Sequence, residues 1–267
     1  MSPWGRLLEK PHPGDHFVQL YDAGETGLAD NVGHYLWEGL KRGEGVLLVV
    51  TPEHQTLLSR FLDHVGADLA TLLDSRQLVF WDARRTLSRF MVDGQPDWRL
   101  FEKAIRAAVR EVRPADGAEG LRAYGEMVSV LWKAHQFAAA VRVEQLWNKL
   151  LEQQSFSLYC SYAVDVLDDE SELANLESVL CAHTHLIPAD ADGDLEAAIH
   201  RSMDKVLGPR ADAIRARIKT HDHARGTVLP SAENSVLWLR TNLPEEADRI
   251  VSLAREYYGQ RAQTAGS

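Results

Sequence analysis

The sequence has little cysteine, little positive charge and no long apolar run, and each shortage excludes a class of protein. Its 267 residues include two cysteines, Cys160 and Cys181, which we expect to be buried or partly buried free thiols because a chain of this size needs no disulfide. The net charge of −10 argues against a free-standing nucleic-acid binder, although it is compatible with a local basic patch. No apolar run approaches the roughly 20 residues of a membrane span, and the N-terminus lacks a signal-peptide core. We therefore expect a cytoplasmic protein.

A glycine-dotted turn near the N-terminus lacks the lysine of a phosphate-binding loop. The segment HFVQLYDAGETGLAD, residues 16–30, resembles the opening strand, turn and helix of a nucleotide-binding domain. Leu28 and Ala29 occupy the positions where lysine and a hydroxyl residue would follow the last glycine, and they can neither balance phosphate charge nor hold Mg²⁺. Three nearby acidic residues would repel a triphosphate. We expect no tight ATP binding, no ATP hydrolysis and no cofactor.

Five β-rich runs alternate with helical patterns, which is typical of βαβ units in a parallel sheet. The expected strands are 16–21, 45–51, 77–82, 121–126 and 156–162. The expected helices among them are 27–42, 53–65, 84–92, 97–112, 138–154 and 169–184. The fold class is therefore α/β, with a parallel or mostly parallel sheet and helices on both faces.

The pattern changes after Pro188. A polar linker, ADADGD, leads to a region that contains only helical patterns, at 194–207, 209–221, 231–242 and 244–260. We expect an α/β domain over 1–188 and a helical C-terminal extension over 189–267 that packs on the sheet domain or on another subunit. The apolar stripe of the last two helices is more typical of a core or a subunit contact than of a cofactor site.

Seven separated segments, in order along the chain, resemble one family. They are HFVQLYD, EGLKRGEGVLLVVTPEH, FMVDGQPD, YGEMVSVLW, VEQLWNKL, FSLYCSY and CAHTHLIP. Together they resemble the MEDS domain, the methanogen and methylotroph DcmR-type sensory domain, over roughly residues 14 to 188. The resemblance implies a RecA/KaiC-like fold with a degenerate P-loop that works in signal transduction and transcription regulation. It also implies small hydrocarbon derivatives as the ligand class and a transcriptional or kinase-type partner protein.

Ligands of open parallel sheets bind beyond the carboxyl ends of the strands, where this sequence places aromatic rings and a few acids. The expected ligand-binding residues are His16, Tyr21, Asp22, Glu126, Trp132 and Tyr162. His16 is included because the family pattern pairs it with Tyr21. We expect Asp22 and Glu126 to lie at adjacent strand ends and to face Tyr21, Trp132 and His16 across a cavity. Two alternatives stay open: Glu126 caps the next helix, and His16 binds a neighbouring carbonyl.

The segment CAHTH, residues 181–185, suggests a metal site because cysteine and histidine are zinc ligands. On a helix, however, His183 and His185 would point about 200° apart and could share an ion only in an extended chain. We therefore expect no metal. Cys160 lies in the middle of an expected strand, which favours burial over a nucleophilic role.

The function that these patterns favour is a non-catalytic sensory protein. It would bind a small, partly apolar molecule at the strand ends and signal to a regulatory protein, without direct contact with nucleic acid or membrane, and a homodimer is compatible with this role. One alternative is a divergent enzyme that uses Glu126 and His16 for acid–base chemistry. Another is a helical docking protein without a ligand.

Overall fold

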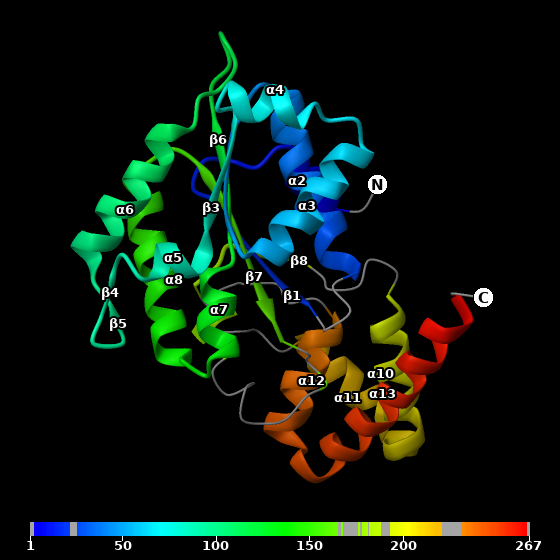
Figure 1. The fold of residues 1–267 in the computed structure, drawn as a ribbon. Helices are drawn as coiled ribbons and strands as arrows, with labels where there is room; N and C mark the ends of the chain where they lie inside the picture. The colour runs from blue at the N-terminus through cyan, green and yellow to red at the C-terminus, as the bar shows by residue number, and fades with distance from the viewer. Residues whose placement is uncertain are drawn as a thin grey trace.

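A single parallel sheet lies at the centre of the computed structural model, with helices on both sides and a helical region at one end (Figure 1). The structure describes residues 3–21, 26–164, 167, 176, 178–180, 182–187, 193–220 and 231–265. Asp22, Cys181 and Pro188 of the sequence analysis lie outside the described residues, as do most of the predicted helix over 169–184 and most of the polar linker at 189–194. The α/β class predicted from the sequence is confirmed.

Within the described residues the central sheet has six strands, and every pair of neighbours is parallel. They are β1 (His16–Tyr21), β2 (Gly45–Val50), β3 (Leu78–Asp82), β6 (Leu121–Gly125), β7 (Ser157–Ala163) and β8 (His185–Ile187), in the order β3-β2-β6-β7-β1-β8. The first five agree with the predicted strands to within one residue at each end. β8 was not predicted, because its three residues are too few for a periodic pattern.

Two layers of helices cover the two faces of the sheet, as predicted. One layer contains α1 (Pro3–Glu9), α2 (Thr26–Lys41), α3 (Pro52–His64) and α4 (Leu69–Asp74). The other contains α5 (Ala83–Leu87), α6 (Trp98–Glu111), α7 (Met127–Lys133) and α8 (Phe137–Leu151). The side chains of β2 are buried at every position, as its unbroken apolar sequence requires between two covered faces.

The predicted helix over 84–92 is wrong in its second half. The helix α5 ends at Leu87, and the chain continues into a short antiparallel hairpin of β4 (Met91–Val92) and β5 (Gln95–Pro96). The turn of this hairpin is Asp93–Gly94, and both residues have positive φ, of 49° and 75°. An Asp-Gly pair is the residue combination that such a two-residue turn favours, so turn chemistry overrode the helical pattern here.

The C-terminal helical region shares an apolar core with the sheet. Its helices are α10 (Asp194–Leu207), α11 (Ala211–Thr220), α12 (Ser231–Asn242) and α13 (Pro244–Ala265). They lie together beyond the end of the sheet to which the arrow of β7 points (Figure 1). Val236 and Ile250 of the apolar stripe are buried in the cluster that also covers β7 and α8, which confirms the core interpretation of the stripe. Among the described helices, none is both long and apolar enough to cross a membrane.

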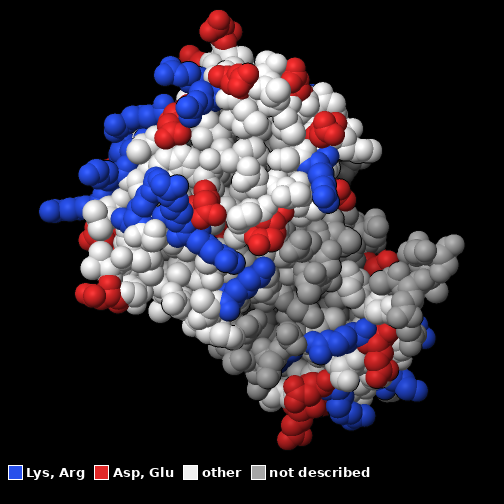
Figure 2. Space-filling model, viewed as in Figure 1, with Lys and Arg blue, Asp and Glu red and all other residues white. Residues whose placement is uncertain are grey.

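Charged side chains are unevenly spread over the surface. Lysines and arginines gather over α5 and α6, on the left of the view in Figure 2. The exposed members on these helices include Arg84, Arg85, Arg99, Lys103 and Arg110. A local basic patch therefore exists on a chain whose net charge is −10.

Candidate functional site

Glu126, at the carboxyl end of β6, is bound to a histidine of α3. Its Oε2 accepts a hydrogen bond from His54 Nδ1 at 2.6 Å, and Glu126 is only 2% exposed. Thr51 positions His54 in the first turn of α3, because its hydroxyl accepts a hydrogen bond from the His54 backbone N–H at 3.5 Å. Glu126 stands at the N-cap position of α7 but makes no side-chain cap hydrogen bond. The alternative in which Glu126 caps the next helix is therefore wrong.

Tyr21, at the carboxyl end of β1, approaches the same histidine. The ring centroids of Tyr21 and His54 are 5.8 Å apart, and Tyr21 Oη lies 3.3 Å from Ser129 Oγ. Lys133 lies over the Tyr21 ring, with Nζ 5.8 Å from its centroid. Tyr21 and Glu126 thus belong to one group that is joined by His54, a residue that sequence reasoning did not single out.

The predicted arrangement of Asp22 and Glu126 at adjacent strand ends is wrong. The strand β7 lies between β1 and β6, so the ends of these two strands are not neighbours. A crossover connection can place two parallel strands apart, with another strand between them in the sheet. The order of the strands along the chain does not show where this happens. Asp22 itself lies outside the described residues, and the predicted cavity stays a prediction.

Trp132 and Tyr162, also predicted to bind ligand, lie in the apolar cluster on the α8 side of the sheet, whereas Tyr21 lies in the cluster on the α2 side. Their rings meet edge to face at 5.2 Å between centroids, and Phe137 packs on Trp132 at 4.7 Å. Tyr162 Oη donates a hydrogen bond to Glu144 Oε1 at 2.6 Å. Tyr162, on which Trp132 packs, therefore binds Glu144 and not Glu126, the glutamate that was predicted to share their site.

Glu144 belongs to a second group of polar side chains, which we call the buried tetrad: His16, Glu144, Cys160 and His183. They are 1%, 0%, 0% and 5% exposed. His16 Nε2 lies 3.4 Å from Cys160 Sγ and 3.4 Å from Glu144 Oε2. The Cys160 thiol donates to Glu144 Oε2 at 3.6 Å, and His183 Nε2 lies 3.3 Å from Glu144 Oε1. Four groups with lone pairs thus meet at one point in the core.

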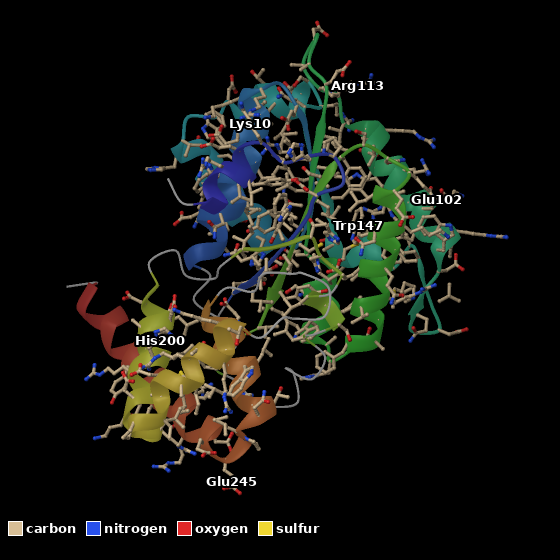
Figure 3. The ribbon with its side chains drawn as sticks, turned by 180° about the vertical axis from the view of Figure 1, so that it is seen from behind. Lys10, Glu102, Arg113, Trp147, His200 and Glu245 are labelled. Carbon is tan, nitrogen blue, oxygen red and sulfur yellow. The ribbon has the colours of Figure 1, made fainter. Side chains whose placement is uncertain are left out.

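The secondary structure explains why these side chains converge. His16 pairs with Leu158, and alternation along the parallel strands β1 and β7 places His16 and Cys160 on the face that α8 covers. Glu144 lies about one helical turn before Trp147, which points from α8 toward the sheet (Figure 3) and packs on β6. A glutamate on the apolar stripe of α8 is therefore directed into the core.

Backbone contacts fix His183 against the start of β1. Thr184 exchanges hydrogen bonds with His16, since Thr184 N–H donates to the His16 carbonyl at 2.8 Å and the Thr184 hydroxyl accepts from His16 N–H at 2.8 Å. The rings of His16 and His183 are 4.1 Å apart between centroids. Pairing of Thr184 with His16 thus brings the segments that carry the two imidazoles together.

Hydrogen bonds also set the tautomers of the two imidazoles. Asn148 Nδ2 donates to the carbonyl of Ala182 at 2.7 Å, so Asn148 Oδ1 must be the atom that faces His16 Nδ1 at 2.8 Å. His16 Nδ1 therefore carries a proton and donates. His183 Nδ1 lies 2.7 Å from the carbonyl of Val179 and donates in the same way. In both residues Nε2 is the atom that faces the other members of the tetrad.

Burial and mutual charge shift the ionisation of the tetrad. Burial alone would raise the pKa of Glu144, but His183 and His16 outweigh it and hold that pKa well below its usual range. Burial and the neighbouring His183 lower the pKa of His16 against the opposing effect of Glu144. Burial, followed by the charge of Glu144, raises the pKa of the Cys160 thiol well above its usual value. Glu144 is thus the anion of the group.

One comparison with known proteins identifies the family of the chain. The sequence model described as MEDS, the "MEthanogen/methylotroph, DcmR Sensory domain", matches residues 15–184. The chain belongs to the MEDS family. No curated protein matches it. The MEDS match contains both the tetrad and the Glu126–His54 pair, and it ends before the C-terminal helices, so both polar groups are part of the MEDS domain.

Sequence reasoning found only part of these groups. His16 opens β1 as predicted, but its side chain binds Asn148, not a neighbouring carbonyl, and it lies at the amino end of its strand, apart from Glu126. Glu144 was missed, although a carboxylate on the apolar stripe of the MEDS segment VEQLWNKL was a readable signal. His183 and His185 do not share a partner, since His185 Nε2 lies 3.2 Å from Asp15 Oδ1.

Proposed function

We propose that the protein is a non-catalytic sensor that binds a small, partly apolar molecule and signals to a transcriptional or kinase-type partner. The sensory assignment of the MEDS family supports this role in general terms. The observation that carries the proposal is the indole of Trp132, which is 1% exposed and whose Nε1 has no hydrogen-bond partner among the residues that the structure describes. We propose small hydrocarbon derivatives as the class of ligand.

A buried donor without an acceptor is costly, because the desolvation of such a group is worth about 1–3 kcal/mol. Around Trp132 the neighbours are the ring edges and faces of Tyr162 and Phe137, which offer apolar contact. A ligand with an apolar body and one acceptor atom would satisfy the indole N–H and gain contact with the rings. A small halogenated or oxygenated hydrocarbon has this chemistry.

A route from this point to the C-terminal helices exists in the packing. Trp132 and Tyr162 belong to the apolar cluster that continues into α10, α12 and α13. Arg255 of α13 also donates a hydrogen bond to the carbonyl of Leu167, just beyond β7. A ligand that shifts Trp132 would therefore change the packing of the helical region, which we propose as the surface that a regulatory protein reads.

The RecA/KaiC-like interpretation of the fold is part of the same proposal. The order of β1, a glycine-dotted segment of sequence and α2 is that of a nucleotide-binding domain, and Leu28 in the first turn of α2 is buried in the apolar core. A helix start with an apolar side chain in place of the lysine supports a sensor that no longer binds nucleotide.

The Glu126–His54 pair is the observation that would favour a divergent enzyme instead. A buried carboxylate within 2.6 Å of an imidazole is a common acid–base unit. This enzyme would use His54 and not His16, because His16 binds Asn148 at the amino end of β1. Multiple turnover of any hydrocarbon derivative by the purified protein would favour it over the sensor.

Native mass spectrometry of the purified full-length chain tests the sensory proposal. We expect a mass above that of the denatured chain, or binding of dichloromethane or methanol as added probes. The same spectrum reports whether the protein is a homodimer. Trp132→Phe, which keeps a ring and removes the N–H, should weaken retention at least tenfold.

Trp147→Phe is the matched control, because Trp147 is also buried and its Nε1 also lacks a hydrogen-bond partner within the described chain. It lies against Phe101 and Phe156, not against Tyr162. Equal retention by the wild type and Trp132→Phe, or equal losses in both tryptophan variants, would contradict the proposed site.

A further inference from the structure

The buried tetrad has the composition and geometry of a metal centre. Its four candidate ligand atoms, one from each residue, all lie within 4.8 Å of one another. We propose that His16, Glu144, Cys160 and His183 bind one divalent first-row transition-metal ion, for which Zn²⁺ is the best fit. This inference goes beyond the proposed sensory function and does not depend on it, and it replaces the sequence-based expectation of no metal.

The spacing of three of the four ligand atoms matches a tetrahedral site. Zinc bonds of about 2.0–2.1 Å to nitrogen or oxygen and about 2.3 Å to sulfur place ligand atoms roughly 3.3 to 3.5 Å apart around a tetrahedral ion. In the tetrad, Glu144 Oε2 lies 3.4 Å from His16 Nε2 and 3.6 Å from Cys160 Sγ, and these two atoms are 3.4 Å apart. His183 Nε2 lies 3.3 Å from Glu144 Oε1, the other oxygen of the carboxylate, and within 4.8 Å of the other candidate ligand atoms. Three ligand atoms thus already have tetrahedral spacing, and the His183 imidazole would move toward them to complete the site.

The orientation of both imidazoles is the one that metal ligands need. His16 and His183 each donate from Nδ1, to Asn148 Oδ1 and to the Val179 carbonyl. The free lone pair is then on Nε2, the atom that faces the centre of the tetrad. Partners of this kind are the usual means by which proteins orient metal-binding histidines. Tyr162 similarly holds Glu144 through Oε1, which leaves Oε2 for the ion.

With both imidazoles neutral, protons do not satisfy this group of atoms. The acceptor positions that face inward are then the two imidazole Nε2 atoms and the two oxygens of Glu144. In that state the donors among the described residues are the Tyr162 hydroxyl, which is used by Oε1, and the Cys160 thiol. His183 Nε2 has no hydrogen-bond partner among the described residues, although it is buried. A cation would interact favourably with these unpaired acceptor atoms, because the lone pair of each can be directed at it.

The charge and softness of the ligands select the kind of ion. A carboxylate and a thiolate together neutralise a dication, and the thiol proton of Cys160 would be released to solvent when the metal binds. Imidazole and thiolate ligands favour Zn²⁺ and its neighbours over Mg²⁺ or Ca²⁺, which prefer oxygen. Four protein ligands close a tetrahedral site, so the ion would have a structural role in fastening the segment before β8 to β1, β7 and α8.

Metal titration of the full-length chain tests this site. The protein is treated with a chelator, exchanged into clean buffer and titrated with Zn²⁺, and metal per chain is measured by plasma mass spectrometry. A parallel titration with Co²⁺ reports the ligands, because a thiolate gives a charge-transfer band and tetrahedral coordination gives strong ligand-field bands. We expect one metal ion per chain and both kinds of band.

Two matched pairs of variants assign the ligands. Cys160→Ser should remove the charge-transfer band, whereas Cys181→Ser should keep it. His183→Asn should weaken Zn²⁺ binding at least tenfold, whereas His185→Asn, which alters a residue that binds Asp15 instead, should leave it unchanged. Wild-type protein without stoichiometric metal, or a cobalt spectrum without the thiolate band, would overturn the proposal even if every ligand variant failed to fold.

Discussion

Two buried glutamates face histidines in this protein, and their surroundings differ. Glu126 meets one imidazole, that of His54, through a single hydrogen bond of 2.6 Å. Glu144 meets two imidazoles and a thiol, and a tyrosine hydroxyl already occupies one of its oxygens. The first is a pair in which one donor matches one acceptor. The second, when its imidazoles are neutral, has more inward-facing acceptors than protons.

The side-chain types alone do not distinguish the two groups, since each combines histidine with glutamate. The orientation of the imidazoles separates them: His54 donates to its glutamate from Nδ1, whereas His16 and His183 use Nδ1 for other acceptors and present Nε2 to theirs. Only the second arrangement suits a cation.

The largest expected effect follows from removing the charge of the tetrad. Glu144→Gln keeps the volume of the side chain but leaves a metal ion, or the imidazoles, without their carboxylate. Because removal of one partner from a buried charged group costs about 3–5 kcal/mol, we expect the free energy of unfolding to fall by about 3 kcal/mol or more. Urea denaturation of the full-length chain measures it. A loss below about 1 kcal/mol would mean that the tetrad does not hold the core together.

The equivalent change in the other pair should have a smaller effect. Glu126→Gln still offers an oxygen to His54 and loses only the charge of the acceptor, so we expect a loss of about 1–2 kcal/mol in the free energy of unfolding. Its zinc content should equal that of the wild type. Reduced zinc content in this variant would show that the two glutamates are not independent and would break the comparison.

The smallest expected effect concerns the partner of Glu144. Tyr162→Phe removes the hydroxyl that orients the carboxylate, and loss of such a partner typically weakens metal binding by about tenfold. The Zn²⁺ titration measures it. Tyr159→Phe is the control, because Tyr159 lies on the same strand but donates to Gln19 on the other face of the sheet. Equal Zn²⁺ affinities in the two variants would contradict the role of Tyr162.

Much of the fold could be predicted because its signals are local. Apolar runs such as VLLVV mark covered strands, and Thr51 with Pro52 marks the start of α3. The hairpin at Asp93–Gly94 was also readable from its Asp-Gly pair, which the predicted helix over 84–92 did not take into account. The short strand β8 had no comparable signal.

The site could be predicted only in part, because it depends on the order of strands in the sheet. Tyr21 and Glu126 were expected together and are joined by His54, which lies in a helix between them in sequence. The tetrad combines residues as far apart as His16 and His183, and no local pattern shows that their segments pair. Glu144 is the exception, since an acid on an apolar helical stripe requires a partner.

X-ray absorption at the zinc edge tests the central difference between the two glutamate sites most directly. The full-length chain loaded with one equivalent of Zn²⁺ should show one sulfur at about 2.3 Å and three nitrogen or oxygen ligands at about 2.0–2.1 Å. A shell of this kind requires Cys160 or Cys181, and its persistence in Cys181→Ser would assign it to the tetrad. A first shell without sulfur, or zinc that is lost on simple buffer exchange, would contradict the account.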